Sequence, residues 1–195
     1  MFSKDGVDEL LMTLDKFCTT IYATGGTYKY IAESNYKNPL IKVEDITGYP
    51  SILGGRVKTL HPKVFGGILN RRNFESDIND VAQYEIPAID MVIVDLYPFE
   101  KTVESGSPEE DIIEKIDIGG VSLIRAAAKN FEDVLIVSSV EQLPSVTQYL
   151  AENEGCTSLE MRRKMAAMAF SVTSHYDTAI FNYFDIKENL TDCFT

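Results

Sequence analysis

The chain has 195 residues, of which 45% are hydrophobic, and this is enough for one sizeable core. Its 30 acidic and 18 basic residues give a formal net charge of -12, which argues against nucleic acid and anionic membranes as partners. Because the three cysteines lack metal-ligand spacing and neither a signal peptide nor an apolar run of about 18 residues occurs, we expect one cytoplasmic domain.

Strand and helix patterns alternate along the chain. In chain order, the sequence predicts a helix over 5–17, a strand over 19–24, a helix over 27–34, strand 41–46, helix 77–84, strand 89–98, helices 108–116 and 119–130, strand 133–139, helix 141–152 and a long last helix. That last helix is expected to start at a capping box of Thr157 and Glu160 and to end near residue 184. The pattern indicates an α/β fold: an open, mostly parallel sheet with helices on both faces.

An acid-free segment runs from Ile46 to Phe74, although acids are frequent elsewhere. It contains five basic residues: Arg56, Lys58, Lys63, Arg71 and Arg72. Upstream, "ATGGT" (23–27) follows a strand and precedes a helix, so its backbone N–H groups and threonine hydroxyls are suited to a phosphate. Glycines that only turn the chain would give the same pattern. Taken together, the two segments predict a site for a small anion.

Two more loops fall where ligands of open α/β sheets bind, beyond the carboxyl ends of strands. "DLYPF" ends the most apolar strand and places Asp95 and Tyr97 there, although a core aromatic beside a turn proline explains it equally well. "DIGG" puts Asp117 ahead of a helix that carries Lys129 near its end. Taken singly, Asp117 and Lys129 are better explained as charges that the helix dipole favours at its two ends.

The motifs "ATGGT", "GGRVKTLHPKV", "DLYPF", "DIGG" and "RAAAKN", in this order and spacing, resemble the inosine monophosphate (IMP) cyclohydrolase domain of the bifunctional purine-biosynthesis family. The resemblance implies a methylglyoxal-synthase-like domain over residues 1–184, a homodimer, and neither cofactor nor metal. The polar residues after it are expected to form a tail over 185–195, and the location expected from the composition is cytoplasmic. The family's second, transformylase domain has no room here, so a stand-alone cyclohydrolase is expected, with a separate transformylase as a possible partner.

In this family the reaction closes the six-membered ring of formyl-aminoimidazole-carboxamide ribotide and releases IMP and water. Carried over residue by residue, the resemblance gives catalysis to Lys58, Tyr97, Asp117 and Lys129. It gives substrate binding to a larger set: Ser3, Lys4, Thr24, Gly25, Gly26, Thr27, Arg56, Thr59, Val94, Asp95, Ile118, Gly119 and Gly120. Lys58 and Tyr97 would stabilise the developing formyl oxyanion, and Lys129 paired with Asp117 would move the amide proton. We expect the catalytic residues and Arg56 to line a single pocket.

Three departures from the family pattern accompany the resemblance. Members usually begin with a full apolar strand ending in Ser-Val, whereas here Met1-Phe2 precedes the matching segment, so the first strand is expected to be shortened or missing. Phe65 replaces a usual histidine, and Asp95 a usual asparagine; an aspartate accepts a hydrogen bond from the base but donates none.

Two rival functions share the fold. A non-catalytic regulatory module would need the phosphate loop but not the four catalytic residues together. Methylglyoxal synthase shares the anion site, but "RVKTLHP" and "DIGG" are not its pattern. The joint presence of the four residues favours the cyclohydrolase.

Overall fold

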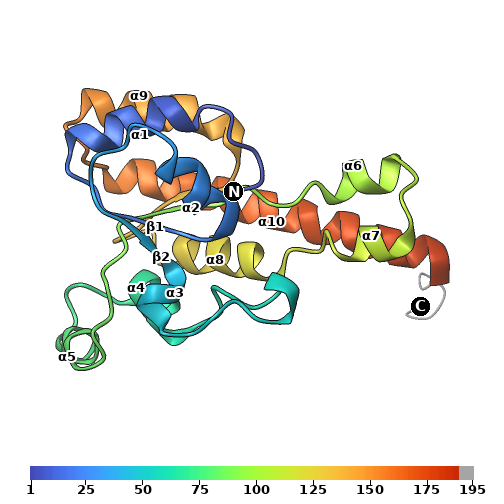
Figure 1. Ribbon diagram of the computed structural model, residues 1–195, viewed down its shortest axis with the longest axis horizontal. Helices are drawn as coiled ribbons and strands as arrows, with labels where there is room; N and C mark the ends of the chain where they lie inside the picture. Colours follow the sequence, from blue (N-terminus) through green and yellow to red (C-terminus); the bar gives the residue numbers. More distant parts are fainter. Residues whose placement is uncertain (189–195) are drawn as a thin grey trace.

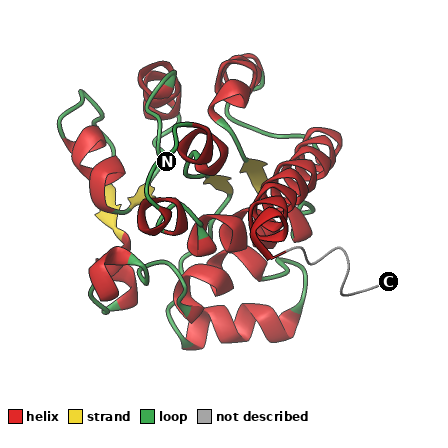
Figure 2. Ribbon diagram, turned by 90° about the vertical axis from the view of Figure 1, so that its right-hand side faces the viewer, coloured by secondary structure: helices red, strands yellow, loops and turns green. Residues whose placement is uncertain are grey.

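The structure is a computed structural model that describes residues 1–188. Helices surround short parallel strands (Figures 1 and 2). The strands are β1 (Ile21–Ala23), β2 (Leu40–Lys42), β3 (Met91–Ile93) and β4 (Leu135–Val137). The helices are α1 (Val7–Lys16), α2 (Gly25–Ala32), α3 (Val43–Thr47), α4 (Pro62–Leu69), α5 (Glu75–Gln83), α6 (Phe99–Glu104), α7 (Glu109–Ile113), α8 (Ile118–Lys129), α9 (Leu143–Glu152) and α10 (Leu159–Glu188). Short 3₁₀ helices cover Leu53–Gly55 and Val140–Gln142.

The strands form two parallel pairs. β1 pairs with β2, with Ile21 opposite Leu40, and β3 pairs with β4, with Met91 opposite Leu135. The parallel pairing confirms the α/β prediction. The strands form two separate two-stranded sheets where one open sheet was expected, because no hydrogen-bonded ladder joins the two pairs within residues 1–188. Residues 1–4 form no strand, as the departure at the start of the sequence predicted.

The core is centred on β4, whose side chains Leu135, Ile136 and Val137 are at most 1% exposed. α8 packs against β3 and β4, α10 lies against α8 and β4, and α1 packs against α9. Covered in this way, β4 has the continuous apolar sequence that a strand buried on both faces requires. Ile136→Ala would cost about 2–5 kcal/mol, since the surrounding core collapses only partly into the space.

Several elements differ in extent from the prediction. The strand expected over 41–46 ends at Lys42, because Val43–Thr47 turns into a helix, and the strand expected over 89–98 covers only Met91–Ile93. α4 was not predicted, because its glycine pair resembles a turn. Pro62 nevertheless starts that helix, because its fixed φ suits the first helical position.

The long C-terminal helix is confirmed, with a corrected start and end. Ser158 Oγ accepts from the Met161 amide (3.1 Å), whereas the Thr157 side chain accepts from Arg162, so the Thr157–Glu160 capping box is wrong. α10 continues to Glu188, four residues past the predicted end, and the rest of the predicted tail (189–195) lies outside the described residues. α6 and α7 lie along its C-terminal half (Figure 1). No helix within the described chain is long and apolar enough to cross a membrane.

Candidate functional site

The N-terminal segment connects the loops that follow β1 and β3. The Ser3 amide donates to Asp95 Oδ2 (2.6 Å), and the Met1 amine donates to Thr27 Oγ1 (3.3 Å). Lys4 Nζ donates to the Met1 carbonyl at 2.6 Å. The structure therefore brings Ser3, Lys4, Thr27 and Asp95 together at the carboxyl ends of two strands that belong to different pairs.

Asp117 is the N-cap of α8, and its Oδ1 accepts from the Gly120 amide at 2.6 Å. This confirms the interpretation of Asp117 as an acid that stabilises the helix N-terminus. Burial raises the pKa of Asp117, while the hydrogen bond from Gly120 and the charges of the Met1 amine and Lys58 oppose that rise. The charge of Lys58 is the smallest of these influences on the pKa of Asp117.

The glycine pair of "DIGG" allows two close approaches. A Cβ at Gly119 would lie 3.0 Å from Thr59 Oγ1, and a Cβ at Gly120 would lie 2.4 Å from Asp117 Oδ2. Any side chain at Gly120 would force the carboxylate to move, because real Cβ contacts of that length essentially do not occur. The two glycines thus let the Thr59 loop and the Asp117 carboxylate both sit against the start of α8.

Tyr97 lies at the edge of the same region. Its side chain is 36% exposed, so the alternative of a core aromatic is wrong. The ring makes an edge contact with Phe2 (centroids 6.0 Å apart), and Lys115 Nζ lies 5.7 Å from the ring centroid. Two other expected substrate-binding residues lie nearby. Ile118 is 61% exposed. Val94 is buried, and its amide donates to the Val137 carbonyl (2.9 Å), so the pairing of β3 with β4 continues to this residue.

The predicted phosphate loop has the geometry of an open helix N-terminus. Thr24 is the N-cap of α2, and its side chain makes no capping hydrogen bond. Gly25 has φ +46°, a left-handed conformation that glycine adopts readily. A Cβ built at Gly25 or Gly26 would meet no heavy atom within 4 Å. The first turn of α2 carries no acidic residue, so the positive end of its dipole is available to an anion.

Arg56 does not point into this region. Its guanidinium forms an ion pair with Glu114, just after α7, and both side chains are largely exposed. The hydrogen bond from this carboxylate raises the pKa of Arg56, and the same contact lowers the pKa of Glu114. No local pattern could indicate Glu114, because its partner lies 58 residues earlier in the chain.

Lys129 is separated from Asp117 by the whole length of α8. The helix has 12 residues, so at about 1.5 Å per residue the two backbones lie about 18 Å apart. Lys129 is exposed in the last turn, where the dipole favours a cation. The expected single pocket containing both Asp117 and Lys129 is therefore wrong within one chain.

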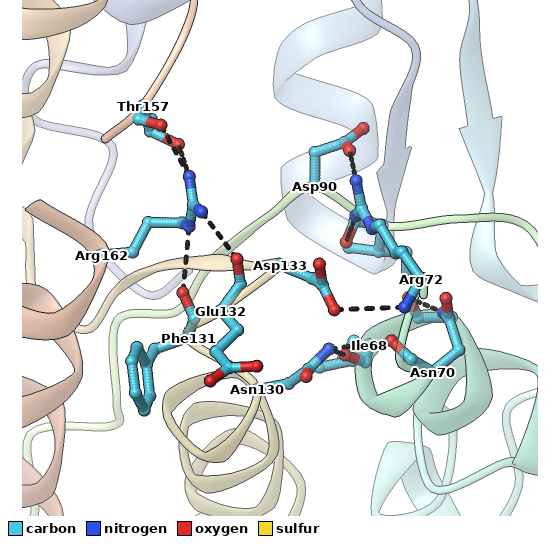
Figure 3. A network of polar contacts seen from close by, with 12 residues as sticks. Ile68, Asn70, Arg72, Asp90, Asn130, Phe131, Glu132, Asp133, Thr157 and Arg162 are labelled. Atoms are coloured by element: carbon cyan, nitrogen blue, oxygen red, sulfur yellow. Dashed lines mark hydrogen bonds and ion pairs between the residues drawn. The ribbon is translucent and has the colours of Figure 1, made fainter. Parts of the chain in front are cut away.

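The end of α8 that carries Lys129 belongs to a network of structural contacts (Figure 3). Asn130 Nδ2 donates to the Ile68 carbonyl (2.8 Å) and to the Asn70 carbonyl (3.0 Å), which fastens α8 to α4. Arg162 donates to the carbonyls of Phe131 (3.0 Å) and Glu132 (2.6 Å), which fastens the following turn to α10. The "RAAAKN" motif thus has a packing role at this end of the helix.

Two surface hollows lie near α10. One, of about 340 Å³, adjoins the strand ends and is lined in part by Asp95, Ser138, Ser139 and Tyr176. The other, of about 420 Å³, lies between α8 and α10 around Arg125 and Phe170, and no expected site residue lines it. We place the candidate site beside the smaller hollow, because Asp95 and Tyr176 line it and Tyr176 contacts Asp117.

Two family models together match most of the chain. Residues 6–122 match the family described as "MGS-like domain", and residues 127–194 match that described as "AICARFT/IMPCHase bienzyme". The chain is 58% identical over 188 residues to the bifunctional purine biosynthesis protein PurH of Bacteroides thetaiotaomicron, covering 96% of this chain and 37% of that protein. It is 44% identical over 182 residues to PurH of Bradyrhizobium diazoefficiens, covering 93% and 34%.

A solved structure is similar to this chain over nearly the whole length of both proteins. The match, titled "Crystal structure of ForH", has a TM-score of 0.78 and 33% identity, covering 94% of this chain and 93% of that one. The chain spans only about a third of the length of the PurH proteins it matches.

Proposed function

Because this chain belongs to the MGS-like domain family, we propose that it closes the purine ring of formyl-aminoimidazole-carboxamide ribotide to give IMP and water. The match to a bienzyme family and the similarity to proteins named for purine biosynthesis support this reaction over the regulatory alternative. The observation that carries the proposal is the position of Thr59, which follows Lys58, against the start of α8 next to Asp117.

The reaction forms one carbon–nitrogen bond and releases one water. The carboxamide nitrogen attacks the formyl carbon, and a proton passes from that nitrogen to the formyl oxygen. The resulting hydroxyl leaves with the proton of the formamido nitrogen, which completes the ring. Negative charge develops on the formyl oxygen during attack, so a donor fixed beside that oxygen accelerates this step. Because the step is intramolecular, holding the two groups in contact contributes as well.

In this proposal, Lys58 and the Tyr97 hydroxyl stabilise the formyl oxyanion. Asp117 accepts the amide proton, a task for which a buried carboxylate with a raised pKa is better suited than an ordinary one. The expected partnership of Asp117 with Lys129 is not part of the proposal, because α8 holds the two apart. Lys58 supplies the positive charge beside Asp117 instead.

Binding of the substrate phosphate falls to the Thr24–Thr27 loop together with Lys4. The loop offers backbone N–H groups at the start of α2, and Lys4 lies beside Thr27 through their shared contacts with Met1. Arg56 would join the phosphate only by giving up Glu114, since the exposed ion pair now occupies its guanidinium.

Kinetics of two variants test this division of roles. Lys58→Ala should lower kcat by about 100-fold or more, as loss of an oxyanion donor typically does, while the affinity for IMP changes less. Arg56→Ala should weaken substrate and product binding equally, because the phosphate charge is the same before and after ring closure. Near wild-type kcat in Lys58→Ala would refute the catalytic assignment. A chain that binds IMP but never converts the ribotide would support the regulatory module.

The expected homodimer and cytoplasmic location are also part of this proposal. A sedimentation mass of a single chain at micromolar concentration would contradict the homodimer.

A further inference from the structure

Tyr176 of α10 contacts the backbone at Asp117. Its hydroxyl accepts from the Asp117 amide (2.9 Å) and donates to the Lys115 carbonyl (2.5 Å). The side chain is 8% exposed, and its ring makes an edge contact with Phe99, with centroids 6.2 Å apart. One rigid aromatic side chain therefore bridges two backbone groups of the turn that leads into α8.

These contacts fix Asp117 at two points. Its carboxylate is held by the Gly120 amide, and its backbone is held by Tyr176. Burial raises the pKa of Tyr176 to about 12, so the hydroxyl stays protonated at neutral pH and keeps donating to Lys115. The Tyr176 side chain also lines the hollow that contains Asp95, which places it at the candidate site.

We propose that Tyr176 is a positioning residue for the ring closure, which acts through Asp117 by holding the turn of Lys115 to Asp117 in the orientation that the reaction requires. This rests on the proposed function. It also assigns a role to the middle of α10, a helix that the sequence patterns indicated only as a structural element.

The test is a double-mutant cycle on the full chain with the formylated ribotide as substrate. Tyr176→Phe keeps the ring against Phe99 and removes only the hydroxyl. We expect kcat to fall about tenfold, which is less than the loss expected if the Asp117 carboxylate were displaced by about 1 Å. KM and the affinity for IMP should not change. In an Asp117→Asn background the same change should have almost no further effect, because the residue through which it acts is already disabled. Tyr149→Phe, on α9, is the matched control and should behave like the wild type.

The outcomes separate this proposal from its premise. If the wild type turns over and Tyr176→Phe matches it, the positioning role is wrong while the proposed function stands. If Tyr176→Phe lowers kcat by the same factor in the Asp117→Asn background, Tyr176 has a general structural role, and this also overturns the proposal. If Tyr176→Phe unfolds, the cycle is repeated in sucrose, which favours the compact state, and failure to fold even there counts against the proposal. A wild type without turnover refutes both.

Discussion

The glycine at position 120 offers a sharp test of the site, because its role depends on a single short distance. A Cβ there would lie 2.4 Å from Asp117 Oδ2 and 2.8 Å from Cγ. An ordinary contact begins at 3.4 Å, so in Gly120→Ala the carboxylate must retreat by about 1 Å. A displacement of about 1 Å in a reacting group can cost about 100-fold in rate. We therefore expect kcat to fall between about tenfold and 100-fold.

Stability should change little in the same variant, because two effects oppose each other. Weakening the N-cap costs about 0.5–2 kcal/mol. Replacing glycine by alanine in a helix gains about 1 kcal/mol. The net change is close to zero, so the melting temperature should stay near that of the wild type while the rate falls.

The assay compares kcat from IMP formation with the melting temperature, using Ser122→Ala on the same helix as a control. Ser122 lies one turn inside α8, and its hydroxyl bonds only to the Ile118 carbonyl among the contacts described. A wild-type kcat in Gly120→Ala, or a rate loss fully matched by unfolding, would contradict the role given to the Asp117 carboxylate position.

Three further predictions concern the charged residues. Asp117→Asn should lower kcat without loss of stability at neutral pH. Burial raises the pKa of Asp117 in the folded protein, so the contribution of this carboxyl group to stability falls as the pH rises from the unfolded-state pKa to the folded-state pKa. Thermal melts of the wild type and the variant at several pH values check this. Glu114→Gln should leave the melting temperature unchanged and tighten IMP binding by about threefold in calorimetry, because it frees Arg56 from an exposed ion pair; weaker binding would contradict this. Lys129→Ala should retain most of the turnover that Lys58→Ala loses, and equal losses in the two variants would show that Lys129 reaches the site after all.

The elements with strong local patterns could be predicted from the sequence. β4 was recognisable because Leu135–Val137 is apolar throughout, and α10 because its helical sequence has no breaker. The expected end of a strand at residue 46 was wrong because Val43 has a high strand propensity, yet two acids follow it at the start of a helix, where the dipole favours them.

Sequence motifs also indicated most of the candidate site, but not how its parts are arranged. The pairing of Asp117 with Lys129 came from the family resemblance, whereas the helix-dipole argument placed the two at opposite ends of one helix, and the length of α8 agrees with the latter within one chain. The contact between Tyr176 and Asp117 joins positions 59 residues apart, so no local spacing could indicate it. Pairings of this kind are set by tertiary packing and emerge only once the helices are placed.

The proposed function is tested most directly by incubating the purified chain with formyl-aminoimidazole-carboxamide ribotide and following the absorbance of IMP. We expect IMP to form well above the uncatalysed rate, at a rate proportional to the amount of chain. IMP formation that equals the uncatalysed rate, in a chain shown by calorimetry to be folded and to bind IMP, would contradict the proposed function.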